Sequence, residues 1–265
     1  MQKSNYAVGK ETQKKIWKAG RKLFYEKGLD ATTYDDISKA AGINRALIPY
    51  YFKTKHQLGR KIFREITEEF YEELDKAIDL SQYSQQLQNN IQSFGYYRLL
   101  KNEQYGRFAA QIFMNEVFTD DMTQSENDYI RAYIRQDTNL TEKEIAILSR
   151  LDYGIEREII NVIHGNEKQA DIDEICIIEL RMLLQYCGYT EAEINELAMK
   201  TVEVLDQCRF EVKSGFKIVF INSGCRRQNR GLSLTGVCLK KHFSNTPRRK
   251  SQIEMPGFSD FVSSV

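Results

Sequence analysis

A glycine between two short amphipathic segments constrains the fold of this chain more than any other feature. Gly42 separates residues 36–41 from a second short segment that starts at Asn44. Because glycine has no Cβ, the backbone can turn sharply at this position. Two short helices that meet at such a turn form a helix-turn-helix unit. The apolar residues expected to pack the two helices together are Ile37, Ala41, Ile43 and Ile48, and Ala40 is small enough to allow their close approach.

The flanking residues predict a third helix before this unit and a long helix after it. Residues 11–27 are amphipathic, and Gly28 is expected to end that helix. Thr33, with an acidic residue three positions later, forms a capping box for the first helix of the unit. Asn44 can cap the second helix, and Thr54 a long helix that runs toward Ile78.

The residue types in this region suit a DNA surface. Arg45 can bond a guanine edge in a bidentate way, and Ala46 is small enough to let a helix enter the major groove. Together with Asn44, they stand where a recognition helix meets base edges. The alternative is a small packing unit with a solvated basic face. Side chains expected to reach phosphates are Thr33, Tyr50, Tyr51 and Lys55.

A longer pattern over residues 12–64 resembles the head of the TetR family of bacterial repressors. The matching text is Leu23–Gly28, Ala31–Ile37, Ala40–Ala46 and Tyr50–Lys55, followed by Leu58. The resemblance implies an N-terminal three-helix head, a helical body that binds a ligand and dimerises, and release from DNA when an effector binds. It covers about a fifth of the chain; beyond it, the body matches only in being helical and of suitable length.

Pro49 departs from the family pattern, which usually has an aromatic residue there. A proline inside a helix removes the N–H that would bond the carbonyl of Arg45, and its ring crowds that turn. Such a proline costs on the order of 3 kcal/mol unless the helix bends. We therefore expect altered geometry in the second helix and no phosphate contact from position 49.

The remaining sequence predicts an all-α protein with an irregular C-terminal tail. Helices are expected near 84–101, 103–117, 124–136, 141–164, 171–187 and 190–211. Thr141 and Thr190 start further capping boxes, and residues 172–187 are apolar on most sides and should be buried. The predicted domains are a helix-turn-helix DNA-binding head at 10–70 (motif about 33–52), an effector-binding and dimerisation domain at 71–212, and a tail at 213–265.

Aromatic residues crowd the middle helices, and cavities lined by such residues suit apolar or cationic effectors. Ordinary core packing is the alternative for each of them. The candidate effector pocket comprises Tyr97, Tyr105, Phe108, Phe113, Tyr129 and Tyr133.

Two apolar stripes suggest a homodimer, in which two helices of each copy form a four-helix interface. Packing within one chain is the alternative. The stripes are Ile145, Leu148, Leu151, Ile155, Ile159 and Val162, and Ile194, Leu197, Thr201, Leu205 and Cys208.

The tail differs sharply from the body. From Lys213 onward there are ten Lys and Arg against two acidic residues, five glycines and no helical period. A strand at Phe216–Ile221 would have no partner, so we expect disorder, or a segment foreign to the family. The basic residues could instead add non-specific DNA affinity. We expect a chain truncated at Ser214 to remain a folded dimer that binds its operator.

Catalysis, cofactors and metals have little support. The three histidines are far apart in sequence, and Cys225, Cys238 and His242 lack the paired spacing of a zinc site. No apolar run is long enough to cross a membrane, and the five scattered cysteines favour reduced thiols in the cytoplasm. We therefore expect no enzyme, no cofactor and no metal.

The predicted function is a dimeric repressor that binds a pseudo-palindromic double-stranded operator and is released by an unknown small-molecule effector. The alternatives are a ligand-independent DNA-binding regulator of the same architecture and a helical enzyme whose head only mimics the motif.

Overall fold

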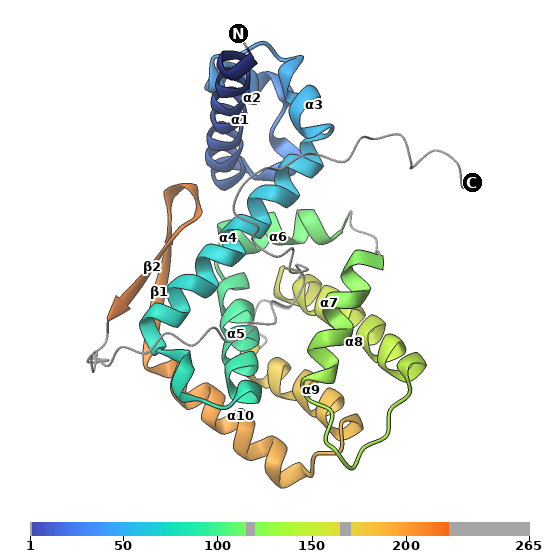
Figure 1. Cartoon of the computed structure of the whole chain (residues 1–265). Coiled ribbons are helices and arrows are strands. Elements are labelled where there is room, and N and C mark those ends of the chain that lie inside the picture. The colour runs from blue at the N-terminus through green and yellow to red at the C-terminus, as the bar shows by residue number, and fades with distance from the viewer. Residues whose placement is uncertain (1, 115–119, 165–170, 223–265) are drawn as a thin grey trace.

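The computed structural model describes residues 2–114, 120–164 and 171–222. Three helices form an N-terminal head, which lies at the top of Figure 1: α1 (Gln2–Ala31), α2 (Tyr34–Ala41) and α3 (Leu47–Phe52). The long helix α4 (Lys55–Ile78) runs from the head into a helical body. The predicted class, a helix-turn-helix head followed by a helical body, is confirmed.

The body consists of six helices and a short 3-10 turn after α4 among the described residues. They are the turn Leu80–Gln82, α5 (Gln85–Leu100), α6 (Glu103–Phe113), α7 (Asp120–Arg131), α8 (Glu142–His164), α9 (Ile172–Tyr186) and α10 (Glu191–Asp206). None of the described helices is long and apolar enough to cross a membrane.

Side-chain caps explain where several of these helices begin. The three predicted capping boxes, at Thr33, Thr141 and Thr190, are all present. In each, the threonine hydroxyl accepts the backbone N–H three residues on, while a carboxylate accepts the threonine N–H. These bonds satisfy N–H groups that have no partner within the helix. Gly28, with φ 83, interrupts α1 near its predicted end.

The segment after α10 is a β-hairpin, which corrects two predictions. Strand β1 (Cys208–Lys213) pairs antiparallel with β2 (Lys217–Asn222), and Phe210 lies opposite Phe220. The predicted helix to residue 211 is therefore wrong after Asp206, and the expectation that the second strand has no partner is wrong. Alternating burial along β1 is the period of a half-buried strand. The tail residues 223–265 lie outside the described residues.

The hairpin packs along α4, and its turn reaches the lower end of α1 (Figure 1). Phe70 of α4 contacts the rings of both Phe210 and Phe220, at centroid distances of 5.3 Å and 5.9 Å. One continuous apolar core joins the head, α4, the body and the hairpin. The predicted boundary between domain and tail at residue 213 therefore falls in the turn of a packed element.

Candidate nucleic-acid interface

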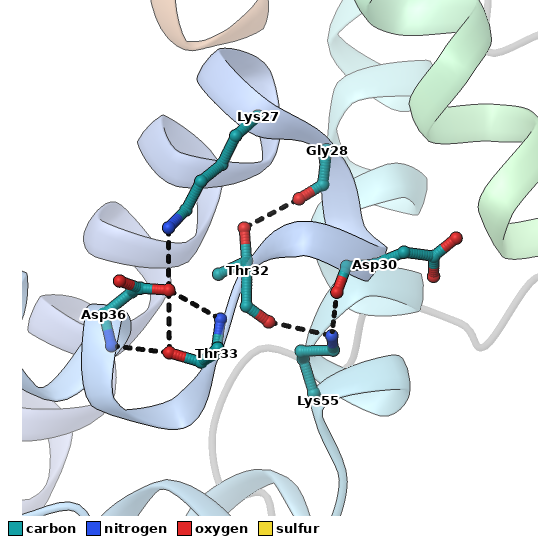
Figure 2. Close-up of polar contacts among 7 residues, drawn as sticks. All are labelled: Lys27, Gly28, Asp30, Thr32, Thr33, Asp36 and Lys55. Atoms are coloured by element: carbon teal, nitrogen blue, oxygen red, sulfur yellow. Dashed lines mark hydrogen bonds and ion pairs between the residues drawn. The ribbon is translucent and has the colours of Figure 1, made fainter.

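The N-terminus of α2 is fixed by a network around Thr33 (Figure 2). The Thr33 hydroxyl donates to Asp36 Oδ2 at 2.7 Å and accepts from the Asp36 N–H at 3.1 Å. Lys27 of α1 brings its Nζ within 2.7 Å of the same carboxylate oxygen. The Lys27 ammonium, with the bonds from Thr33, holds the pKa of Asp36 well below its usual range. The start of α2 is therefore anchored to α1.

Lys55 also lies in this network, where its ammonium is bound to the protein itself (Figure 2). Its Nζ donates to the carbonyl of Asp30 at 3.1 Å and to that of Thr32 at 2.8 Å. Its backbone N–H donates to the hydroxyl of Tyr34 at 2.8 Å. Two of the three ammonium donors are therefore already used to join the α1–α2 loop to the start of α4.

The turn between α2 and α3 has the predicted geometry. Gly42 has φ 61 and ψ 42, the left-handed conformation that favours glycine. Asn44 Oδ1 accepts the backbone N–H of Ala46 at 2.9 Å within the turn, but the N-cap of α3 is Ala46, so the prediction that Asn44 caps this helix is wrong. Asn44, Arg45 and Ala46 are all exposed and stand together immediately before α3.

Pro49 lies near the start of α3 and not in the middle of a longer helix. It is the third residue of a six-residue helix, where backbone N–H groups have no partner within the helix. The carbonyl of Arg45 instead accepts the N–H of Ile48 at 3.1 Å. The predicted loss of a hydrogen bond therefore does not arise, because α3 begins later than the sequence indicated.

The exposed face of this unit carries the side chains suited to DNA. Arg45 is 62% exposed and pairs with Asp35 at 3.0 Å, with its guanidinium 5.9 Å from the Tyr34 ring centroid. Tyr50 is 76% exposed and meets the half-buried Tyr51 edge to face, with centroids 4.9 Å apart. The side chains of Arg45 and Tyr50 are thus accessible to a binding partner.

Lys53 is a further candidate that the sequence analysis missed. It is exposed at the C-terminal cap of α3, directly after the two tyrosines, and has a positive φ of 57. Its place beside Tyr50 and Tyr51 in the sequence was the available indication. A lysine at the end of α3 adds an exposed positive charge to the helix-turn-helix unit.

The six aromatic residues predicted to line a pocket separate into two groups. Tyr105, Phe108 and Phe113 of α6 pack around Phe63 of α4, with centroids 5.7, 6.2 and 5.7 Å from its ring. The Tyr105 hydroxyl is 2.9 Å from Thr67 Oγ1, and burial raises its pKa well above the usual range. This group is core packing at the junction of head and body.

The other three aromatics lie among buried polar groups. Tyr97 donates to Glu179 Oε1 at 2.7 Å, and Tyr133 donates to Asn90 Oδ1 at 2.6 Å. The Tyr129 hydroxyl is 3.4 Å from that of Tyr133. An enclosed cavity of about 10 Å³ is lined by Asn90, Ser93, Phe94, Tyr129, Asp152, Glu179, Leu180 and Leu183.

Buried acidic residues in the body were also missed from the sequence. Asp152 and Glu156 of α8 are 4% and 0% exposed, and Glu126 of α7 is 0% exposed. Asp152 and Glu156 share the helical face of Ile145 and Ile159, so their spacing within an apolar stripe was the available indication. Two larger hollows among the described residues are open surface grooves of about 520 and 380 Å³, and none of the six predicted aromatics lines either of them.

Both described histidines contact backbone carbonyls. His56 Nε2 lies 3.2 Å from the carbonyl of Ile112, and His164 Nε2 lies 3.0 Å from that of Leu100. A carbonyl only accepts, so each of these ring nitrogens carries the proton. The described residues contain no group of three or more His, Cys, Asp or Glu side chains that could hold a metal.

The α2–turn–α3 arrangement defines a protein of the helix-turn-helix class. A family model described as bacterial regulatory proteins, tetR family, matches residues 16–62, which include α2, the turn and α3 in full. The head therefore matches the tetR family, and the predicted resemblance is confirmed.

Similar proteins are known by sequence and by structure. The biofilm operon icaADBC HTH-type negative transcriptional regulator IcaR of Staphylococcus epidermidis is 49% identical over 39 residues, 15% of this chain and 21% of that protein. The chain thus matches about a fifth of that relative's length. TylP, a TetR regulator from Streptomyces fradiae, is 18% identical with a TM-score of 0.45, over 74% of this chain and 96% of that one. CprB from S. coelicolor A3(2) is 16% identical with a TM-score of 0.40, over 73% and 99%.

Proposed function

We propose that the protein is a dimeric transcriptional repressor that binds a pseudo-palindromic operator and leaves it when a small molecule binds in the body. The observation that carries the proposal is the exposed edge formed by Arg45, Ala46 and Tyr50 on a capped helix-turn-helix unit. The negative regulation named for IcaR supports repression over activation.

Arg45 is the residue proposed to read a base. In the free protein it pairs with Asp35, but both side chains are more than half exposed. Such a surface pair contributes about 0–1 kcal/mol, whereas a bidentate contact to guanine contributes about 1–3 kcal/mol of discrimination. The exchange of Asp35 for a guanine edge is therefore favourable. Ala46 leaves room for the backbone of the turn to approach the groove.

Phosphate contacts would position this unit on the duplex. The N-terminus of α2 at Thr33 and that of α4 at Thr54 present backbone N–H groups, which attract anions. The Tyr50 hydroxyl is exposed and can donate to a phosphate oxygen, and Tyr51 stands beside it. Lys55 can contribute with its remaining donor only, so we assign it a smaller share of the contact.

A second copy of the chain would cover an apolar face formed by α8 and α9. Helix α9 is apolar on most sides, yet Ile178, Met182 and Tyr186 are 48%, 51% and 65% exposed. We expected this helix to be buried, but within one chain only one of its sides is covered. On the neighbouring α8, Ile147 and Leu151 are exposed as well. Two copies joined here would place two heads on half-sites one helical turn, roughly 34–36 Å, or a multiple apart.

The effector is proposed to bind where Tyr129, Tyr133 and Asn90 meet the acidic residues of α8 and α9. Asn90 is fully buried, and its Nδ2 has no hydrogen-bond partner among the residues that the structure describes. Unsatisfied buried polar groups are costly, so a ligand that accepts from this amide would be stabilised. The enclosed volume of about 10 Å³ holds about one water molecule, so binding of an organic effector requires the helices around it to move apart.

That small volume favours one alternative, a regulator of the same architecture without an effector. Pockets for drug-sized ligands usually measure about 300–1,000 Å³. If the cavity never opens, no small molecule would release the protein from DNA.

The proposal is tested by selecting duplexes from a random library with the full-length protein. We expect enrichment of an inverted repeat, with binding that weakens steeply as salt is raised and that exceeds binding to random duplex by at least about 10³-fold. Failure to enrich any sequence would contradict the proposal. A screen for compounds that release the selected duplex then separates the effector-controlled regulator from the ligand-independent one.

A further inference from the structure

The turn of the C-terminal hairpin is hydrogen-bonded to an arginine of the head. Arg21 of α1 donates from Nε to the carbonyl of Gly215 at 2.7 Å and from Nη2 to that of Phe216 at 3.2 Å. The same guanidinium makes a bidentate pair with Glu69 of α4 at 2.6 Å and 2.5 Å. One nearly buried side chain, 11% exposed, thus joins the head, α4 and the hairpin.

Phe216 fills the space between the head and the body beside this arginine. Its side chain is fully buried. Its ring stacks on Phe108 of α6 with centroids 5.0 Å apart, and meets Tyr25 of α1 edge to face at 5.3 Å. A residue far along the chain therefore contacts both the first helix of the head and helix α6 of the body.

The backbone at this turn is strained. Phe216 has φ 58, in the left-handed region that bulky side chains rarely adopt. Such a conformation persists only where the surrounding contacts outweigh its cost. The Arg21 bonds and the aromatic contacts are the interactions that hold it, so the buried position of this ring is strongly determined.

We infer that the hairpin turn, Ser214–Phe216, is a positioning element that fixes the orientation of the head on the body. Helix α1 packs against both this turn and α6, and Gln111 of α6 accepts the Leu29 N–H with its Oε1 at 2.7 Å. Without the turn, α1 keeps the contacts to α4 and α6 but loses those made by Arg21 and Phe216, and the head gains freedom to pivot. The consequence for operator binding rests on the function proposed above.

The test measures head orientation without DNA or effector, so its failure is separate from failure of the proposed function. Spin labels are attached through unnatural amino acids at the exposed positions Lys39 of α2 and Lys200 of α10, because the chain contains five cysteines. Excess unlabelled protein is added so that distances within one chain dominate. Pulsed electron resonance gives the distribution of the distance between the labels.

We expect a narrow distribution in the parent protein and a wider or shifted one in Phe216→Ala. The matched control is Tyr96→Ala, which removes a ring that is only 2% exposed from α5 in the body and should leave the distribution narrow. A merely structural role would lower the melting temperature of both variants without widening either distribution, and that result would overturn the inference.

A second variant keeps the test decisive if Phe216→Ala fails to fold. Arg21→Lys retains the charge, but a single ammonium cannot reproduce the forked contacts to Glu69 and both hairpin carbonyls. We expect this variant also to widen the distribution. An unchanged distribution in folded Arg21→Lys would refute the positioning role.

Discussion

At the scale of single residues, Glu193 makes the stability of the body depend on pH. Bonds from Thr190, first from its N–H and then from its hydroxyl, and the contact with Arg135 lower the pKa of Glu193 from 4.5 to about 2. A carboxylate with a lowered pKa in the folded state stabilises the fold above its ordinary pKa, and that contribution is lost as the pH falls through the folded value. We therefore expect Glu193→Gln to be less stable than the parent protein near neutral pH.

The difference should shrink as the pH falls from 4.5 toward about 2, because the protonated glutamate then resembles glutamine. Urea unfolding of both proteins across that range measures it. Glu196→Gln is the control, since it removes the same charge from an exposed position of the same helix and leaves the capping box intact. A constant difference between the parent protein and Glu193→Gln at every pH would contradict the assignment.

Arg45 is the residue whose removal should change sequence preference. We expect Arg45→Ala to weaken binding to the selected duplex by about 1–3 kcal/mol and to reduce discrimination at one base pair of each half-site. Competition binding with duplexes substituted at single positions measures both effects.

Lys39→Ala is the matched control for Arg45, because it removes one positive charge from an exposed position on the same head. We expect this variant to bind all duplexes more weakly by a similar factor, with its base preference intact. If both variants kept the parent preference, Arg45 would act on phosphates and the proposed base contact would be wrong.

Residues whose role depends on near neighbours could be predicted from the sequence. The Thr33 capping box and the left-handed Gly42 follow from residues within four positions, and both are confirmed. Pro49 and Lys55 could not be predicted in this way. The cost of a proline depends on where α3 begins, and the ammonium of Lys55 meets carbonyls more than twenty residues away in the chain.

At the scale of elements, the hairpin shows why the end of the body was predicted wrongly. The stripe Leu197, Thr201, Leu205 and Cys208 continues a helical period past Asp206, while Phe210 and Val212 alternate with charged residues as a strand does. A short run of residues can fit both the helical and the strand period. Which structure it forms then depends on the segment that it packs against. That partner, Lys217–Asn222, had been assigned to an irregular tail.

The hairpin revises the expected effect of truncation. A chain that ends at Lys213 loses β2 and the buried ring of Phe216, whose burial contributes about 1.5–3 kcal/mol. We expect its melting temperature to be lower by roughly 3–12 °C than that of a chain that ends at Asn222, which keeps the hairpin. Circular dichroism melts of the two chains give the comparison, and equal melting temperatures would restore the original expectation that residues from Ser214 onward are dispensable.

At the scale of the whole molecule, apolar periodicity located buried faces without revealing what buries them. Ile194, Thr201 and Leu205, predicted for a subunit interface, are buried within their own chain, as are Ile145 and Ile159. Of the two predicted stripes, only Leu151 is strongly exposed, and its helix α8 packs against α9, which carries the other exposed residues of the proposed interface. A helical period shows that a helix has an apolar face. It does not distinguish a face that packs against a neighbouring helix from one that packs against a second copy of the chain.

The dimer proposed on α8 and α9 is tested by placing a charge on that face. Glutamate at position 182 or 151 would have to lose its hydration in the interface without a partner, which costs several kcal/mol. We therefore expect Met182→Glu and Leu151→Glu to sediment as monomers in analytical ultracentrifugation.

Ile221→Glu is the control, because Ile221 is a comparably exposed apolar residue on the hairpin, at the other side of the body in Figure 1. If dimers persist in Leu151→Glu and Met182→Glu but dissociate in Ile221→Glu, the interface lies on the hairpin and the proposed face is wrong. In that case an interface on β2 would set the distance between the two heads. The half-site spacing of the selected operator would then have to match that distance.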